Sequence, residues 1–411
     1  MERKRFYRFA LAVSVLASFI LKVLLIAKYR NLLTLSSDDL NYVKSAVMII
    51  ARGIFTYYDL TEPTVFVMPL YPYFLAGFFK VLGWGLVGLQ AVRIIQAVLS
   101  CITIVLVYFS AKKLLSEPAA LISAFLVSFY VPDIVTAGYF LTETLFTTLL
   151  ALLIFLSLES ASKPSRAKFL ILGSVWAAAT YCRPTIALYP VIFAPYLFFH
   201  HRMKVRKIMS YGLLMSISFF LLMSPWWVRN YLEYGKFIPL TASSGNPMLQ
   251  GTYIDYRQTP ENTVVYGTGK TELETDMTEV RIAKERILSG FKKDFWGYLR
   301  WYTIGKTFSL WKGPFYWKQF FGISYQSVLI FHFLILILGF SGIMALAFED
   351  VFKYMLPVSV LLYFNVVHCL YMSFDRYAFP LMPLLSIFSA YTLQKAAICI
   401  KSFSMAMLKR S

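Results

Sequence analysis

Residues 35–83 read LSSDDLNYVKSAVMIIARGIFTYYDLTEPTVFVMPLYPYFLAGFFKVLG and place two adjacent carboxylates, Asp38 and Asp39, directly after an apolar run. A connector between two membrane spans needs only a few polar residues, whereas this stretch is long, semi-apolar and aromatic. Within it, NYVKSAVMIIARG (41–53) spaces its apolar residues on one helical face and keeps its lysine and arginine off that face. We therefore expect a helix lying in the membrane interface, followed by a proline-rich return to the membrane.

The composition of the whole chain explains why a membrane is expected. Of its 411 residues, 58% are hydrophobic and 18% are aromatic, and the mean hydropathy is +0.62. A soluble protein of this composition would have too little polar surface to cover its core. The sequence therefore predicts an all-α polytopic membrane protein. Its four cysteines are scattered through apolar segments without the spacing of a zinc site or a disulfide framework.

The formal net charge of +19 is better explained by membrane lipid than by nucleic acid. Much of the lysine and arginine lies in short loops between apolar runs, where it orients the spans and meets anionic headgroups. A nucleic-acid-binding protein would carry a basic soluble domain interleaved with aromatic residues, and the sequence contains none. Membrane lipid is therefore an expected partner, and nucleic acid is not.

The first apolar run, which ends near Ala27, follows the basic N-terminal residues MERKRFYR. This run is too long for a secretory signal and lacks a small-residue cleavage site, so we expect a spanning helix. The positive-inside bias puts its start in the cytoplasm. The first loop (30–88), with Asp38 and Asp39, then lies on the extracytoplasmic face.

The remaining apolar runs bring the expected number of spans to ten. They cover about 89–111, 118–132, 141–158, 169–199 read as two helices broken at Arg183-Pro184, 208–224, 325–347, 355–372 and 378–396. The chain is thus expected to form one membrane domain (1–400) with a long extracytoplasmic segment (225–322) and a basic cytoplasmic tail (401–411). We find no internal repeat of the kind from which many transporters are built.

Three carboxylates on the expected outer face are candidates for chemistry. Asp38 and Asp39 are either functional or simply solvated loop acids. Glu143, in YFLTETLF, begins an otherwise apolar helix, where a carboxylate is costly unless it is paired or faces water. A helix N-terminal acid favoured by the macrodipole is the alternative for Glu143.

Three arginines, Arg183, Arg229 and Arg376, sit at the outer ends of expected spans beside proline or aromatic residues. Each is either a snorkelling anchor or a ligand for an anionic substrate. A phosphate-bearing lipid would need such a basic surround, because arginine holds phosphate oxygens with two donors at once. A carboxylate can also act as general base toward an acceptor hydroxyl while the cations stabilise a departing phosphate.

Several short segments, in the family's order along the chain, resemble the GT-C glycosyltransferases, in the branch related to protein O-mannosyltransferases and the aminoarabinose transferase of lipid A. They are DDLNY (38–42), PLYPYFLAGFFKVLG (69–83), LTETLF (141–146), CRPT (182–185), PWWVRNY (225–231) with IPLTASSGNPMLQGT (238–252), and DRYAFPLMP (375–383). The resemblance covers the chain to about residue 385. It implies a GT-C helical bundle, a polyprenyl-phosphate-linked sugar donor and an extracytoplasmic active site with an essential acid in the first loop.

The resemblance also implies roles for single residues. By its spacing to Tyr42 the essential acid matches Asp38, with Asp39 as the companion acid. Glu143 matches a second acidic position of the family. The expected catalytic residues are therefore Asp38 and Asp39, and the expected substrate-binding residues are Tyr42, Glu143, Arg183, Arg229, Arg376 and Tyr377. One position departs from the lipid A branch, because Glu62 precedes the proline-rich helix where those relatives carry lysine, and that branch's substrate is not expected here.

The sequence thus predicts an inverting membrane glycosyltransferase that acts on an extracytoplasmic acceptor, either a glycolipid, a polysaccharide or a protein. A transporter or flippase of an anionic lipid is the alternative, and a non-catalytic scaffold of the same fold is a third. No cofactor is required by the motifs. A divalent metal ion remains open, because Asp38, Asp39 and Glu143 offer oxygen ligands, although no histidine joins them.

Overall fold

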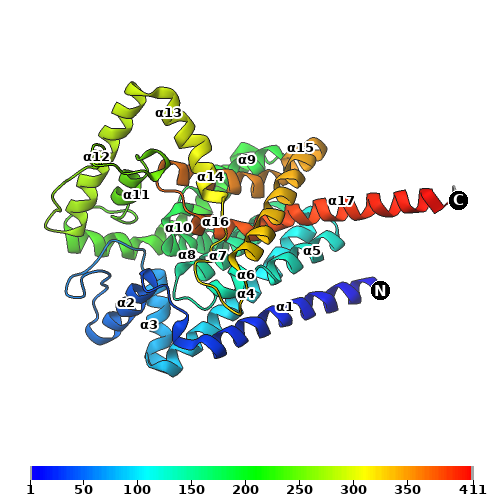
Figure 1. The fold of residues 1–411 in the computed structure, drawn as a ribbon, viewed down its shortest axis with the longest axis horizontal. Coiled ribbons are helices and arrows are strands. Elements are labelled where there is room, and N and C mark those ends of the chain that lie inside the picture. The colour runs from blue at the N-terminus through cyan, green and yellow to red at the C-terminus, as the bar shows by residue number, and fades with distance from the viewer. Residues whose placement is uncertain (1, 409–411) are drawn as a thin grey trace.

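The computed structural model describes residues 2–408, and the side chains of residues 5–402. Every regular element in this range is helical. The start of α1 (Glu2–Tyr29) and the end of α17 (Met382–Leu408) lie at one end of the molecule, whereas α2 (Asp38–Arg52) and α3 (Leu70–Leu82) lie toward the other (Figure 1). The all-helical bundle predicted from the sequence is confirmed.

Within the described residues, six helices are long and apolar enough to cross a membrane. They are α1, α4 (Leu86–Leu114), α7 (Thr142–Ser162), α10 (Val205–Tyr234), α15 (Tyr325–Leu370) and the segment Asp375–Ser402, which includes most of α17. Shorter apolar helices accompany them at α3, at α5 (Glu117–Ser128) and at Pro184–Phe199. The protein is therefore an integral membrane protein, and the count of ten spans stays a prediction.

The long apolar run at 169–199 is divided where the sequence predicted. α8 (Arg166–Cys182) ends at Arg183, whose backbone is extended, and Pro184 opens a short 3-10 turn before α9 (Tyr189–Phe199). Proline disfavours helical geometry in the residue before it and has no N–H to donate, so the helix ends there. The guanidinium of Arg183 is thereby placed at the turn between two helices.

One predicted helix end was wrong, and one predicted break is present. The expected span 208–224 does not end before Pro225, because α10 runs through this proline to Tyr234 and ends at Gly235 with a left-handed φ of 62°. Its last turns pack on the loops, since the indole of Trp226 donates to the carbonyl of Leu240 at 2.9 Å. The break expected between 325–347 and 355–372 is present in α15, where two helices meet at a kink. Only Asp350 is non-helical there, and its carboxylate accepts from the amide of Lys353 at 3.1 Å, which caps the second half.

The helix expected in the first loop is present as α2. It begins at Asp38, and Gly53 ends it with a φ of 70°, a conformation that glycine adopts without strain. Its buried face carries Asp39, Tyr42 and Ala46. The amphipathic helix is confirmed, while its position at the membrane interface stays a prediction.

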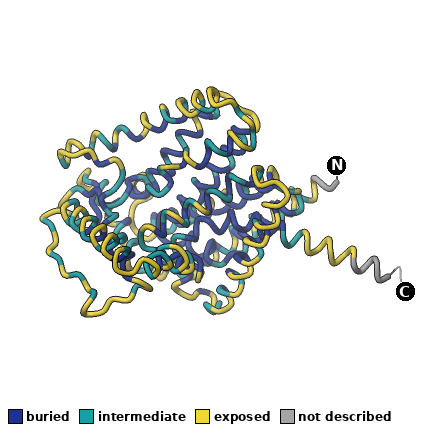
Figure 2. Tube along the Cα trace, turned by 90° about the horizontal axis from the view of Figure 1, so that it is seen from above, coloured by how far each residue is buried: buried dark blue, intermediate teal, exposed yellow. Residues whose placement is uncertain are grey.

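The segment between α10 and α15, predicted to be extracytoplasmic, is largely folded into helices. They are α11 (Gly245–Gln250), α12 (Glu272–Lys293), α13 (Phe295–Arg300), a π-helical stretch (Trp301–Gly305) and α14 (Lys306–Trp311). In Figure 1, α12 and α13 project from the bundle at the end away from the tip of α17. Buried residues concentrate in the centre of the bundle, and exposed ones on the outlying turns (Figure 2).

One buried ion pair fastens α1 to the bundle. The ammonium of Lys22 lies 2.9 Å from the carboxylate of Asp133 on α6 (Val131–Thr136), and it also donates to the hydroxyl of Ser18 at 2.6 Å. Ser100 of α4 donates to the same carboxylate at 2.6 Å. Charges inside a membrane are costly unless paired, and Lys22 and Asp133 are each other's partner.

Candidate active site

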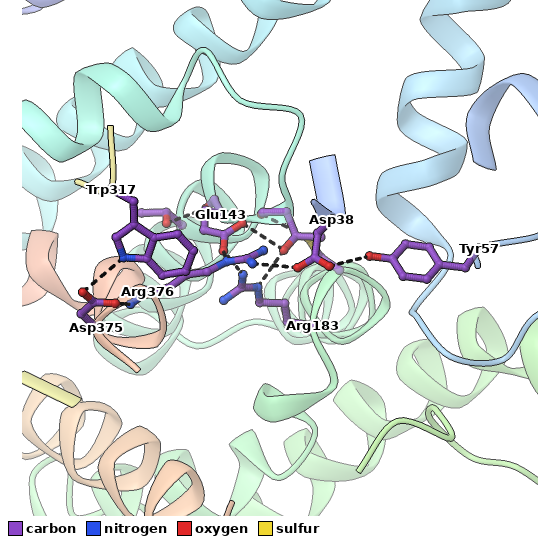
Figure 3. A network of polar contacts seen from close by, with 10 residues as sticks. Asp38, Tyr57, Glu143, Arg183, Trp317, Asp375 and Arg376 are labelled. Atoms are coloured by element: carbon purple, nitrogen blue, oxygen red, sulfur yellow. Dashed lines mark hydrogen bonds and ion pairs between the residues drawn. The ribbon is translucent and has the colours of Figure 1, made fainter. Parts of the chain in front are cut away.

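Asp38 and Arg376 meet although more than three hundred residues separate them in sequence. Asp38 is the first residue of α2, and Arg376 lies on the short helix α16 (Asp375–Ala378). A guanidinium nitrogen of Arg376, Nη1, lies 2.7 Å from Asp38 Oδ2. On its other side, Asp38 Oδ1 accepts a hydrogen bond of 3.2 Å from the hydroxyl of Tyr57 (Figure 3).

Glu143 joins two arginines at the same place. Its Oε1 lies 2.6 Å from Nη2 of Arg183 and also accepts from Nε of Arg376. Arg183 is oriented by a second bond, from its Nε to the hydroxyl of Thr142 at 2.9 Å. Arg376 therefore bridges Glu143 and Asp38. We call Asp38, Glu143, Arg183 and Arg376 the carboxylate–arginine cluster (Figure 3).

The two carboxylates of the cluster differ in solvent exposure. The side chain of Glu143 is 0% exposed and that of Asp38 is 36% exposed. The two guanidiniums balance the two carboxylates, as buried charges require. Of the two acids, only Asp38 can reach a substrate without a rearrangement of the protein.

Tyrosines line the cluster on the side of the first loop. Tyr42 is buried and packs edge-on against Tyr57 and Tyr71, at ring distances of 5.3 and 5.1 Å. Burial, and next the Asp38 carboxylate, raise the pKa of Tyr42. Burial likewise raises the pKa of Tyr57, so its hydroxyl stays protonated and keeps donating to Asp38. Tyr377, next to Arg376, stacks on His368 with 4.7 Å between ring centres.

Asp39 faces away from the cluster. Its carboxylate accepts from the amides of Leu35 and Ser37 at 2.9 and 3.0 Å and from the hydroxyl of Thr34. The residue is 1% exposed. These contacts fix the turn that precedes Asp38.

Arg229 also lies apart from the cluster. Its Nη1 donates to the carbonyl of Thr64 at 2.8 Å, and its guanidinium lies 5.3 to 5.8 Å from the rings of Phe55, Trp226 and Tyr234. The arginine therefore joins the C-terminal part of α10 to the first loop.

Tyr57 and Asp375 lie near the cluster and were not among the expected site residues. For Tyr57, no sequence feature other than its place in the first loop indicated a role in the site. Asp375 precedes Arg376 in the DRY motif; its carboxylate accepts from the amide of Arg376 at 2.8 Å and from the indole of Trp317 at 3.3 Å (Figure 3). Asp375 thus helps to fix the short helix that carries Arg376.

A family model described as dolichyl-phosphate-mannose-protein mannosyltransferase matches residues 62–228. The matched region contains Glu143 and Arg183, and it stops short of Asp38 and Arg376. No protein of curated function matches the sequence significantly.

Solved structures match nearly the whole chain. AglB, the archaeal oligosaccharyltransferase from Archaeoglobus fulgidus, in complex with an inhibitory peptide and a dolichol-phosphate, has a TM-score of 0.62 and 13% identity, covering 98% of this chain and 52% of its own. ArnT from Cupriavidus metallidurans, bound to undecaprenyl phosphate, has a TM-score of 0.55 and 11% identity, covering 98% of this chain and 63% of its own. At such identities the likeness shows the fold. This chain spans about half the length of the oligosaccharyltransferase.

These matches bear on the question of a metal ion. The Archaeoglobus fulgidus oligosaccharyltransferase has also been solved in complex with Zn and sulfate. Among the described residues of this chain, no three His, Cys, Asp or Glu side chains are grouped as metal ligands. Asp38 and Glu143 face guanidinium groups, and Asp39 faces loop amides. The three carboxylates therefore do not fit a shared metal ion.

Proposed function

We propose that this chain, whose fold is that of the GT-C membrane glycosyltransferases, transfers a sugar from a polyprenyl-phosphate carrier to an extracytoplasmic acceptor. The family match over residues 62–228 and the resemblance of the short motifs support the class of reaction. The observation that carries the proposal is the position of Asp38, a partly exposed carboxylate paired with the guanidinium of Arg376, which Glu143 joins to that of Arg183.

The extracytoplasmic face is part of the proposal. The carboxylate–arginine cluster includes the first residue of α2, and α2 lies away from the end of the molecule where α1 starts and α17 finishes (Figure 1). If the basic start of α1 is cytoplasmic, the cluster faces the other side of the membrane. A lipid-linked sugar can reach that face from the bilayer.

In the proposed reaction Asp38 is the general base. A carboxylate oxygen has two lone pairs, so Asp38 Oδ1 keeps one while it accepts from Tyr57. This lone pair takes the proton of the acceptor hydroxyl as the acceptor oxygen bonds to the anomeric carbon. The bond from that carbon to the phosphate oxygen breaks, and its electron pair leaves with the polyprenyl phosphate. Attack opposite the leaving phosphate inverts the configuration.

The arginines supply the electrostatic part of the mechanism. Before reaction the two guanidiniums are balanced by Asp38 and Glu143. When Asp38 takes the proton, one positive charge of the cluster is no longer compensated. This happens as negative charge develops on the departing phosphate, so the cluster attracts that phosphate most strongly in the transition state. Glu143 holds Arg183 and Arg376 in place for this role.

The other expected site residues keep narrower proposed roles. Tyr42 and Tyr377 border the cluster and are proposed to shape the donor pocket. Arg229 is proposed to meet the lipid phosphate only as it approaches along α10, because its guanidinium is bound to the first loop. Asp39 is proposed to hold the turn before Asp38 and not to take the proton.

The pair Asp38→Asn and Asp39→Asn tests this assignment. Asparagine keeps the size of Asp38 but loses the basic lone pair, so we expect transfer to fall by about a hundredfold or more with donor binding retained. Asp39→Asn keeps one acceptor oxygen for the loop amides and is expected to lower transfer less. The assay follows radiolabelled sugar from polyprenyl-phosphate mannose, the first donor to try, into membrane acceptors, using purified variants.

The outcomes are distinct. Full activity in Asp38→Asn with collapse in Asp39→Asn would reverse the two roles. Full activity in both variants would exclude the two first-loop acids as the catalytic base, whereas absence of transfer by the wild-type protein would favour transport of an anionic lipid.

A further inference from the structure

The backbone just before Arg376 is held by the extracytoplasmic segment. α15 ends at Leu370, and a connector of four residues, 371–374, leads to the helix that carries Arg376. A connector this short transmits any shift of its backbone to the guanidinium. Whatever fixes residues 371–374 therefore also fixes the bridge between Asp38 and Glu143.

Two hydroxyls of the extracytoplasmic segment bind the middle of the connector. The hydroxyl of Tyr256 accepts from the amide of Ser373 at 2.6 Å and lies 3.2 Å from its carbonyl. Ser309, on α14, donates to the same carbonyl at 3.1 Å. Both polar backbone groups of Ser373 are thus satisfied by side chains more than sixty residues away.

Lys306 binds the start of the connector. Its ammonium donates to the carbonyls of Cys369 and Tyr371 at 2.9 and 2.7 Å. The end of a helix leaves carbonyl groups without partners and carries partial negative charge, so a cation is favourable there. The ammonium also lies 3.6 Å from the centre of the Tyr302 ring.

The burial of Lys306 shows that this contact is costly to keep. The residue is 0% exposed, and its two hydrogen-bond acceptors are carbonyls, not carboxylates. Burial lowers its pKa to about 7, with Cys369 acting in the opposite direction. A methionine would fill the same space without this cost. The lysine therefore contributes something other than packing.

We propose that Lys306 is a positioning residue for Arg376: by holding the end of α15, it keeps the connector where the guanidinium spans Asp38 and Glu143. This inference rests on the proposed function. It links the extracytoplasmic segment, through α14, to the residue that stabilises the departing phosphate. Ser309 and Tyr256 serve the same purpose one or two residues further along the connector.

The first test needs no substrate. Lys306→Met removes two hydrogen bonds and should speed hydrogen exchange of the amides in residues 371–377 by about tenfold or more, since one ordinary hydrogen bond alone is worth about tenfold. The control is Arg286→Met, which removes a half-buried cation of the same segment. Arg286 donates to Thr252 and Asn262 and does not touch the connector. Unchanged exchange in Lys306→Met would overturn the proposal.

The second test uses transfer from polyprenyl-phosphate mannose. Lys306→Met should lower the rate about tenfold in wild type but cause no further loss in an Arg376→Lys background, because the lysine acts through Arg376. Equal losses in both backgrounds would show a general structural role and refute the inference. If Lys306→Met does not fold, Ser309→Ala, which removes one bond to the connector, takes its place.

The two proposals fail in different ways. If the wild-type protein transfers no sugar, the proposed function is wrong, and the exchange measurement still decides whether Lys306 holds the connector. If Arg376→Lys transfers at the wild-type rate, the role of Arg376 in transfer is wrong. If Arg376→Lys is impaired while Lys306→Met exchanges and transfers like wild type, only the positioning role is wrong.

Discussion

The contact between Glu143 and Arg183 can be tested by a double-mutant cycle with Glu143→Gln and Arg183→Met. Glu143 is 0% exposed and is shared by two guanidiniums. Glutamine keeps the shape of the side chain and removes its charge. Two buried cations would then face a neutral amide, with Asp38 as the only remaining carboxylate of the cluster.

The structure sets the expected magnitudes. Removing one partner of a buried ion pair costs about 3–5 kcal/mol, so Glu143→Gln should lower the free energy of unfolding by that amount. Arg183→Met should cost less, about 2 kcal/mol, since Arg376 still pairs with Glu143 and one charged hydrogen bond is worth about 1.5–3 kcal/mol. In the double variant one of the stranded cations is gone. Its cost should therefore fall short of the sum of the single costs by about 1.5 kcal/mol or more.

Reversible unfolding of the purified protein in mixed detergent micelles, with increasing fractions of a denaturing detergent, measures these free energies. Leu188→Ala, at an exposed position between the turn at Pro184 and α9, is the control for non-specific effects. If the costs of Glu143→Gln and Arg183→Met simply add, within about 0.5 kcal/mol, the 2.6 Å pair does not hold the cluster together and the reasoning fails.

Two further predictions concern the arginine bridge and the topology. Arg376→Lys keeps the charge, but one ammonium cannot span Glu143 and Asp38. The donor concentration needed for half-maximal transfer should therefore rise about tenfold or more, and an unchanged value would leave Arg376 as an anchor. Cysteine at Ser37 or Thr263 should react with an impermeant thiol reagent in intact cells and cysteine at Ser165 should not, whereas equal labelling of all three would contradict the proposed orientation.

Much of the architecture was predictable because it depends on local patterns. Apolar length identified the membrane helices, and the Arg183-Pro184 break was read correctly because proline acts on its immediate neighbours. The end of α10 was missed, because a contact with a distant segment helped to decide where that helix continued. Propensity alone does not contain this information.

The sequence by itself determined the class of protein, the amphipathic first-loop helix and the set of acids and arginines that can carry chemistry, because composition and spacing are properties of the chain. Only the tertiary structure decided which of them meet. It brought Asp38, Glu143, Arg183 and Arg376 together and turned Asp39 toward its own loop. It likewise placed the ammonium of Lys306 within hydrogen-bond distance of the connector to Arg376. The physical reason is that an ion pair depends on distance in space, and helices far apart in sequence set that distance only when they pack.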